Sequence, residues 1–376
     1  MTRFGLRALL LFWAALLAAV AGGGGMLAWL GPPPPPPVVE APGPAPQPPT
    51  ATLAPPAAEP PLPVVPATAA VADAPTAAAA PPATPPAAPE PPPLAAAAAP
   101  RPSADPVIAP PDPELLETSR HGQLPRLGPD NRSSIRTYAR PFDREDRRPR
   151  IGIIINNMGL FAQHSEEAIR RLPSGVTLAF SPYALRTEAL LERARARGME
   201  LLTALPLEPA GFGQRADPGD RALLTSLPIG ENLERLEWAL SRMQGQVGAI
   251  GGLGGMRGER FAANGELLGT LQTALTRRGL LYVDPRPGAP QPARAFGRGV
   301  DLLLDEPSAV RAEVERQLVE LEALAKRQGS ALGLASDPVP SVVAAIAGWS
   351  AGLEERGAVI APISVLIRRP AEQAGR

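Results

Sequence analysis

The stretch that decides the fold of this chain runs from Arg150 to Gly159 and reads R-I-G-I-I-I-N-N-M-G. A short, isoleucine-rich run bounded by turn residues is typical of a strand that is buried on both faces. Two adjacent amides, Asn156 and Asn157, stand where this strand should end, and Gly159 follows them. Sites in parallel α/β folds are built at the C-terminal ends of the strands. The sequence therefore directs attention to what Asn156 and Asn157 can do.

The same pattern of apolar runs separated by helical segments repeats downstream of this strand. Further strands are predicted at 176–180, 200–205, 247–250, 280–283, 302–304, 331–334 and 359–363. Helices are predicted between them, at 165–172, 187–197, 231–243, 266–278, 308–328 and 340–356. Strands that alternate with helices predict a parallel sheet. Seven or eight such units across 150–367 favour an α/β fold of the (β/α) barrel type, with an open doubly wound sheet as the alternative.

Composition excludes several kinds of site. The 376 residues contain 37 Lys and Arg against 37 Asp and Glu, so bulk charge gives no reason to expect nucleic acid as a partner. The absence of cysteine excludes disulfides, thiolate metal sites and cysteine nucleophiles. Only two histidines are present, His121 and His164, and His121 lies upstream of the predicted barrel. A two-histidine metal site would need both of them.

The N-terminal segment, 1–31, has the features of a membrane anchor. Arg3 and Arg7 precede an uncharged run from Ala8 to Leu30, which is long enough to span the ~30 Å hydrocarbon core of a bilayer. Because the arginines come first, the remaining chain should lie on the periplasmic side of the inner membrane, with a single pass. The alternative is a secretory signal cleaved after Ala19-Val20-Ala21, which would export the chain without an anchor.

Two segments separate this anchor from the predicted barrel. Residues 32–112 are dominated by Pro and Ala and carry few charges, so we expect a disordered linker, extended where it is polyproline II. Residues 113–149 are predicted to form an irregular arm that packs on the domain through Tyr138 and Phe142. The charge run at the end of the arm is predicted to be a solvated face, and 368–376 to be a C-terminal tail.

Several segments in the predicted barrel, taken in order, resemble the divergent polysaccharide deacetylase family, a branch of the NodB-like carbohydrate esterases. They are Ile151–Gly159, Val176–Tyr183 (V-T-L-A-F-S-P-Y), Leu201–Pro209 (L-L-T-A-L-P-L-E-P), Asp217–Thr225, Leu280–Arg286 (L-L-Y-V-D-P-R) and the helix Glu231–Met243. Each motif alone is weak, but their order and spacing together are specific. The resemblance covers 140–367 and implies a NodB-like distorted (β/α) barrel.

The resemblance also implies metal-assisted amide hydrolysis, in which a divalent metal such as zinc activates water and a carboxylate acts as general base. This chain departs from the family at four site positions. The family's two aspartates correspond to Asn156 and Asn157, one histidine to Ala204, a histidine-bearing turn to the region of Gly252, and a Gly-His-Pro motif to Ser336-Asp337-Pro338. A neutral amide can neither take up a proton at neutral pH nor supply the charge that a metal ligand needs.

The sequence thus predicts a family site that has lost both its base and its metal. The positions that correspond to catalytic ones are Asn156, Asn157, Asp284 and Arg286. Glu208, Gly252 and Asp337 are predicted to face a bound glycan, with no metal and no other cofactor. The function expected is binding of a glycan or a protein at the cell envelope.

Three alternatives stay open. One is an active carbohydrate deacetylase with a relocated hard-cation site made of Asp284, Asp337 and Glu208, with or without His164. A second is a conventional zinc hydrolase. The third is a structural component of an envelope complex that uses the outer face of the barrel.

Overall fold

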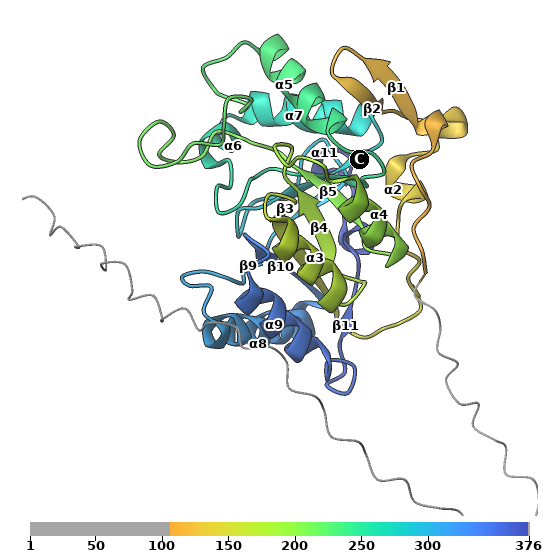
Figure 1. Cartoon of the computed structure of the whole chain (residues 1–376), viewed down its shortest axis with the longest axis vertical. Coiled ribbons are helices and arrows are strands. Elements are labelled where there is room, and N and C mark those ends of the chain that lie inside the picture. Colours follow the sequence, from red (N-terminus) through yellow and green to blue (C-terminus); the bar gives the residue numbers. More distant parts are fainter. Residues whose placement is uncertain (1–105, 375–376) are drawn as a thin grey trace, which may run out of the picture. The chain divides into compact units, whose positions relative to one another are not determined.

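The structure is a computed structural model that describes residues 106–374, and these form an α/β domain around one parallel sheet (Figure 1). The strands in chain order are β3 (Arg150–Met158), β4 (Thr177–Phe180), β5 (Leu201–Ala204), β6 (Gly248–Ile250), β7 (Leu281–Asp284), β8 (Gly297–Gly299), β9 (Leu302–Leu303), β10 (Ser330–Ala335) and β11 (Val359–Ile360). Their spatial order is β8-β7-β6-β5-β4-β3-β10-β9, with β11 paired to the start of β3. All of these pairings are parallel, as the alternation of strands and helices predicts.

The two edges of the sheet meet, which makes the domain a curled barrel rather than an open doubly wound sheet. The edge strands β8 and β9 are separated by only Val300 and Asp301. The backbone N–H of Val300 donates to the carbonyl of Asp284 in β7 (2.9 Å), and that of Asp301 donates to Leu332 in β10 (2.8 Å). Two consecutive residues therefore bond to opposite edges of the sheet.

A buried arginine reinforces this closure. Arg298 is only 4% exposed, and it donates to the Ser330 hydroxyl (2.8 Å) and to the Asp301 carboxylate (2.6 Å). Asp301 in turn accepts a bond from the N–H of Leu332 at 2.7 Å. Strand β8 was not predicted, because Gly297-Arg298-Gly299 contains no apolar run and owes its conformation to these long-range bonds.

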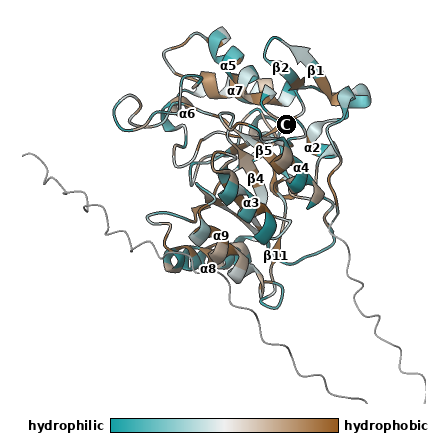
Figure 2. Cartoon of the chain, viewed as in Figure 1, coloured by the Kyte–Doolittle hydropathy of each residue, from teal (hydrophilic) through white to brown (hydrophobic). Residues whose placement is uncertain are grey.

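Helices cover the outside of the barrel in two groups. Helices α3 (Ala162–Arg171), α4 (Glu188–Ala196), α8 (Arg311–Gln328) and α9 (Pro340–Ser350) pack on the outer faces of β3, β4 and β10. Helices α5 (Ile229–Ser241), α6 (Glu259–Ala263) and α7 (Gly265–Arg277) cover β6 and β7. Figure 1 shows α5, α6 and α7 at one end of the domain, α8 and α9 at the other, and α3 and α4 beside β4 between them, and in Figure 2 the central strands carry hydrophobic colouring.

The barrel interior is filled by apolar side chains that alternate with the outward-facing ones along each strand. Its members include Ile154, Leu202, Ile250, Val283 and Leu332. These positions point inward on β3, β5, β6, β7 and β10, while neighbours such as Ile153 and Ala249 belong to the outer clusters. The period of two explains why the strand predictions located the core well.

Some predicted boundaries were wrong. Helix α8 begins at Arg311 rather than 308, and α9 ends at Ser350 rather than 356. The strand predicted at 359–363 is confined to β11, and a short helix, α10 (Ile363–Leu366), follows Pro362. The N–H of Ile363 donates to the Thr177 hydroxyl at the start of β4 (3.3 Å), so α10 lies across the N-terminal ends of the strands.

The arm is more regular than predicted. It holds a 3-10 turn η1 (Pro113–Leu115), an antiparallel hairpin of β1 (Leu116–Ser119) and β2 (Gly122–Pro125), the short turn η2 (Pro129–Asn131) and helix α2 (Ser134–Thr137). Its expected anchors are confirmed: Tyr138 is 2% exposed, and Phe142 packs on the barrel interior cluster. The described residues end with helix α11 (Ala371–Ala374), which lies within the predicted C-terminal tail.

The predicted anchor at 1–31 and most of the predicted linker lie outside the described residues. Within 106–374, no helix is long and apolar enough to cross a membrane. The last residues of the predicted linker are described and are packed: Ile108 is 4% exposed, and its N–H donates to the carbonyl of Arg195 (3.0 Å). The described domain thus begins before residue 113.

Candidate functional site

The amide pair lies inside strand β3 rather than just beyond it. The pairing of β3 with β4 is irregular between Ile155 and Met158, and Asn157 has a left-handed backbone (φ 58°). Asparagine tolerates that conformation better than most residues do. This bulge turns Asn156 toward the barrel mouth, at the C-terminal ends of the strands, and leaves Asn157 half-buried beside β10.

Asn156 is fully buried and uses both ends of its amide. Its Nδ2 donates to the carbonyls of Gly252 (3.2 Å) and Gly254 (3.5 Å), and its Oδ1 accepts from the N–H of Asn157 (2.8 Å). An ionised aspartate could not donate to those two carbonyls. The neutral amide is therefore matched to the turn that covers it.

Asn157 faces the carboxylate of Asp337, the residue that corresponds to the family's Gly-His-Pro motif. Its Nδ2 lies 2.6 Å from Oδ1 of Asp337, which makes a short hydrogen bond to a charged acceptor. Burial raises the pKa of Asp337, and the bond from Asn157 lowers it in part. The Oδ1 of Asn157 is buried with no hydrogen-bond partner among the described residues.

The glycine-rich turn after β6 closes the barrel mouth. Leu253 is 7% exposed and belongs to the apolar cluster of the barrel interior, together with Ala204 at the end of β5. A Cβ atom on Gly252 would lie 2.6 Å from the carbonyl oxygen of Met256 and 3.1 Å from Cα of Arg257. No side chain fits at Gly252 unless the backbone of this turn moves, so a histidine cannot occupy it in this conformation.

Asp284 and Arg286 form an internal ion pair. Arg286 donates from Nε (2.9 Å) and Nη2 (2.7 Å) to the two carboxylate oxygens of Asp284, which is 2% exposed. This bond raises the pKa of the guanidinium. Beside it, burial raises the pKa of Tyr282, whose hydroxyl has no hydrogen-bond partner among residues 106–374.

Glu208 is buried but engaged elsewhere. One carboxylate oxygen accepts from the N–H (2.5 Å) and the hydroxyl (2.6 Å) of Thr225, and the other pairs with Arg260 (3.0 Å). These contacts fasten the loop before α5 and the start of α6 to the end of β5. Glu208 is occupied in holding loops rather than directed at the amide pair.

A second carboxylate near Asp337 was not predicted. Asp305 accepts bonds from the N–H (2.7 Å) and the hydroxyl (3.2 Å) of Ser336, and burial raises its pKa, with Asp337 adding to the rise. Asp305 directly follows the strand predicted at 302–304, so the rule that directed attention to Asn156 could have found it. His164, by contrast, lies on α3 against the ring of Phe161 (centroids 5.7 Å apart).

A family model described as divergent polysaccharide deacetylase matches residues 153–367, more than half of the chain. The chain belongs to the divergent polysaccharide deacetylase family. It is 33% identical to an uncharacterized protein of Agrobacterium tumefaciens C58, whose crystal structure aligns with a TM-score of 0.60 over 65% of this chain and 99% of that one. It is also 23% identical to an uncharacterized protein of Haemophilus influenzae over 55% of this chain and 72% of the relative.

A solved deacetylase with substrate, 13% identical with a TM-score of 0.40, is too distant for its site to be compared with this one. The described residues do not fit the metal that deacetylase chemistry of this family uses. Among residues 106–374, no three His, Asp or Glu side chains gather where they could hold an ion. Asp337 bonds to an amide, Asp284 to a guanidinium and Glu208 to Thr225 and Arg260. At the positions where the resemblance implies the base and the ligands, this chain has two amides, an alanine, a glycine and Asp337.

Proposed function

We propose that this chain is a catalytically degenerate, membrane-tethered deacetylase-like protein that binds a glycan or a protein partner at the cell envelope. The observation that carries the proposal is the self-contained mouth of the barrel. The side-chain amide of Asn156 is satisfied by contacts that include Gly252 and Gly254, Nδ2 of Asn157 donates to Asp337, and Leu253 belongs to the apolar interior beneath. The changes at Asn156, Asn157, Ala204 and Gly252 are neutral or apolar where hydrolysis needs a base and a metal, and the carboxylate of Asp337 is bonded to Asn157.

The contacts of the remaining carboxylates argue against the relocated site. Binding a cation at Asp284 would require release of Arg286, and Glu208 would have to leave Thr225 and Arg260. Freeing the buried carboxylates of Asp284 and Glu208 from these charge-assisted bonds costs free energy before any ion is gained. A working deacetylase would therefore need a rearranged mouth.

The catalytic half of the proposal is tested with acetylated chito-oligosaccharides, zinc or magnesium, and purified protein. We expect no acetate release and no stoichiometric zinc by elemental analysis. Loss of a general base alone lowers rates by ~10²–10⁴-fold. Asn156→Asp combined with Asn157→Asp should not restore activity, since Ala204 and Gly252 still supply no ligand. Metal-dependent acetate release by the wild-type chain, lost in Asp284→Asn or Asp337→Asn, would refute the proposal.

The binding half is tested by calorimetric titration with the same oligosaccharides. Binding without turnover would favour a glycan ligand. No binding, combined with a specific protein recovered from membranes only when the domain is intact, would favour a protein partner.

The proposed tether rests on the sequence of the N-terminal segment. A phosphatase fused after Arg376 should be active in the periplasm, because Arg3 and Arg7 precede the apolar run. An inactive fusion in cells that contain the protein would overturn the proposed orientation.

A further inference from the structure

A pocket lies at the opposite end of the barrel from the amide pair. It has a volume of about 540 Å³, within the range of small-molecule sites. Its walls come from the arm, from the residue preceding β8, and from α10 and the segment that follows it. The arginines that line it are Arg136, Arg144, Arg368 and Arg369, and the ring of Phe296 lies among them.

The position of these segments follows from the strand directions. Arg144 precedes β3, Phe296 directly precedes β8, and the N–H of Ile135 donates to the carbonyl of Gly279 just before β7 (3.3 Å). All strands of the sheet run parallel, so their starts lie at the end away from Asn156. This pocket is therefore separate from the barrel mouth.

The walls are held in place by bonds that do not involve the arginine side chains. Arg368 exchanges two backbone hydrogen bonds with Gly297 (2.8 and 3.1 Å). Ser364 donates from its N–H to the buried carboxylate of Glu200 (3.0 Å), which also accepts from the N–H of Arg140 in the arm (2.9 Å). Glu200 thus joins the arm to the C-terminal segment, and the pocket is formed before any ligand arrives.

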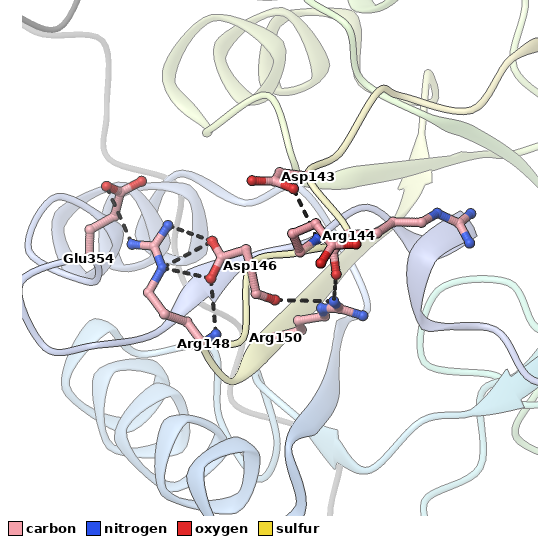
Figure 3. A network of polar contacts seen from close by, with 7 residues as sticks. Asp143, Arg144, Asp146, Arg148, Arg150 and Glu354 are labelled. Carbon is pink, nitrogen blue, oxygen red and sulfur yellow. Dashed lines mark hydrogen bonds and ion pairs between the residues drawn. The ribbon is translucent and has the colours of Figure 1, made fainter.

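Among the described residues, the four guanidinium groups have no carboxylate partner, although the chain as a whole is neutral. In 106–374 no carboxylate lies within ion-pair distance of any of them, and none has a side-chain hydrogen bond. Figure 3 shows the contrast within one segment: Arg148 is bonded to Asp146 and Glu354, whereas the guanidinium of Arg144 extends away from that network. Only the carbonyl of Arg144 takes part, as acceptor from Arg150 (3.0 Å). Most other arginines of the domain have a carboxylate partner.

We propose that this pocket binds a phosphate-bearing ligand with at least two negative charges. Four cations around one pocket repel one another and are stabilised by a multiply charged anion more than by a single carboxylate. The planar guanidinium fork matches phosphate oxygens in a bidentate manner. Ile135, Val365, Ile367 and Phe296 line the same pocket, so an apolar body attached to the phosphate would also be accommodated. Such a ligand is either a soluble phosphorylated compound or the headgroup of an anionic lipid.

The test uses the full chain in a non-ionic detergent, titrated by calorimetry at about 0.15 M ionic strength. The probes are inorganic pyrophosphate and a short-chain phosphatidic acid below its micelle concentration. We expect saturable binding of both. If phosphatidic acid binds about tenfold more tightly than pyrophosphate, the apolar residues contact the ligand and the ligand is a lipid. If the two affinities are equal, the ligand is a soluble phosphate.

Variants decide whether the pocket is the site. Arg136→Gln and Arg368→Gln change exposed side chains and should each lower affinity for pyrophosphate about tenfold, because each removes one charge-assisted contact. The matched control is Arg215→Gln, an exposed arginine outside the pocket that carries the same loss of charge. An equal loss in the control, or no saturable binding of either probe up to about 1 mM, would overturn the proposal.

Discussion

The hydrogen bond between Asn157 and Asp337 can be tested by a substitution at Asn157 that places a second carboxylate opposite Asp337. In the wild-type chain the amide Nδ2 donates to Oδ1 of Asp337 at 2.6 Å, and burial raises the pKa of Asp337 from its ordinary value of 3.8. Asn157→Asp keeps the size of the side chain and is compatible with the left-handed backbone at this position. It replaces a donor with a negative oxygen.

The size of the effect follows from the geometry. Two carboxylates about 3 Å apart repel by about 5 kcal/mol at an effective dielectric constant near 20. The folded variant can avoid this repulsion if the two carboxylates share one proton. Holding that proton costs about 1.4 kcal/mol for each unit by which the pH exceeds the pKa of the unfolded chain. We therefore expect a loss of about 5 kcal/mol at about pH 8 and about 1.5 kcal/mol at about pH 5. The sign is set by proton uptake: the pair's folded-state pKa is raised, so stability is present at low pH and is lost as pH rises above about 4.

The assay is urea unfolding of 32–376 between about pH 5 and pH 8. The matched control is Asn157→Asp combined with Asp337→Asn, which exchanges the two groups and restores one donor facing one carboxylate. It should recover most of the lost free energy and of the wild-type pH dependence. A single variant as stable as wild type at the higher pH, or a loss that does not change with pH, would refute this account of the contact.

Two further predictions concern the parts of the domain that the sequence did not reveal. The chain 106–376 should have the same melting temperature as 32–376. The chain 113–376 should melt several degrees lower, because burial of Ile108 is worth about 1.5–3 kcal/mol. Equal melting temperatures for 106–376 and 113–376 would contradict the packing of Ile108. Arg298→Met should destabilise by about 3 kcal/mol in urea unfolding, because it leaves Asp301 without its cation at the barrel closure; a change under about 1 kcal/mol would show that β8 and β9 close without it.

The location of the candidate site could be predicted from the sequence, but the contacts made by its side chains could be predicted less well. The rule that sites lie at strand ends led to Asn156, Asn157, Asp284 and Asp337, and all four side chains form specific polar contacts there. The same rule also led to Glu208, yet its carboxylate is held by Thr225 and Arg260. The direction of a side chain depends on partners that lie far away in sequence, and spacing along one strand does not contain them.

The turn over the mouth illustrates the same limit. Its glycines predict a flexible turn that fills an emptied site, but nothing local indicates that Gly252 and Gly254 present their carbonyls to Asn156. Asn156 and Gly252 are 96 positions apart in the sequence and are brought together only by the strand order. In the folded structure, the neutral amide of Asn156 is a suitable donor for the carbonyls of this turn.

What the sequence determined by itself was the alternation of strands and helices, the apolar face of each, and the family to which the motifs belong, because these depend on side-chain periodicity and local backbone preference. Tertiary structure alone decided the closure of the barrel through Gly297–Leu303, the burial of Arg298 and the arginine-lined pocket beneath the arm. Those features arise where segments without apolar runs are fixed by hydrogen bonds and charges from distant parts of the chain. Such long-range partners have no local pattern, so only the folded arrangement brings them together.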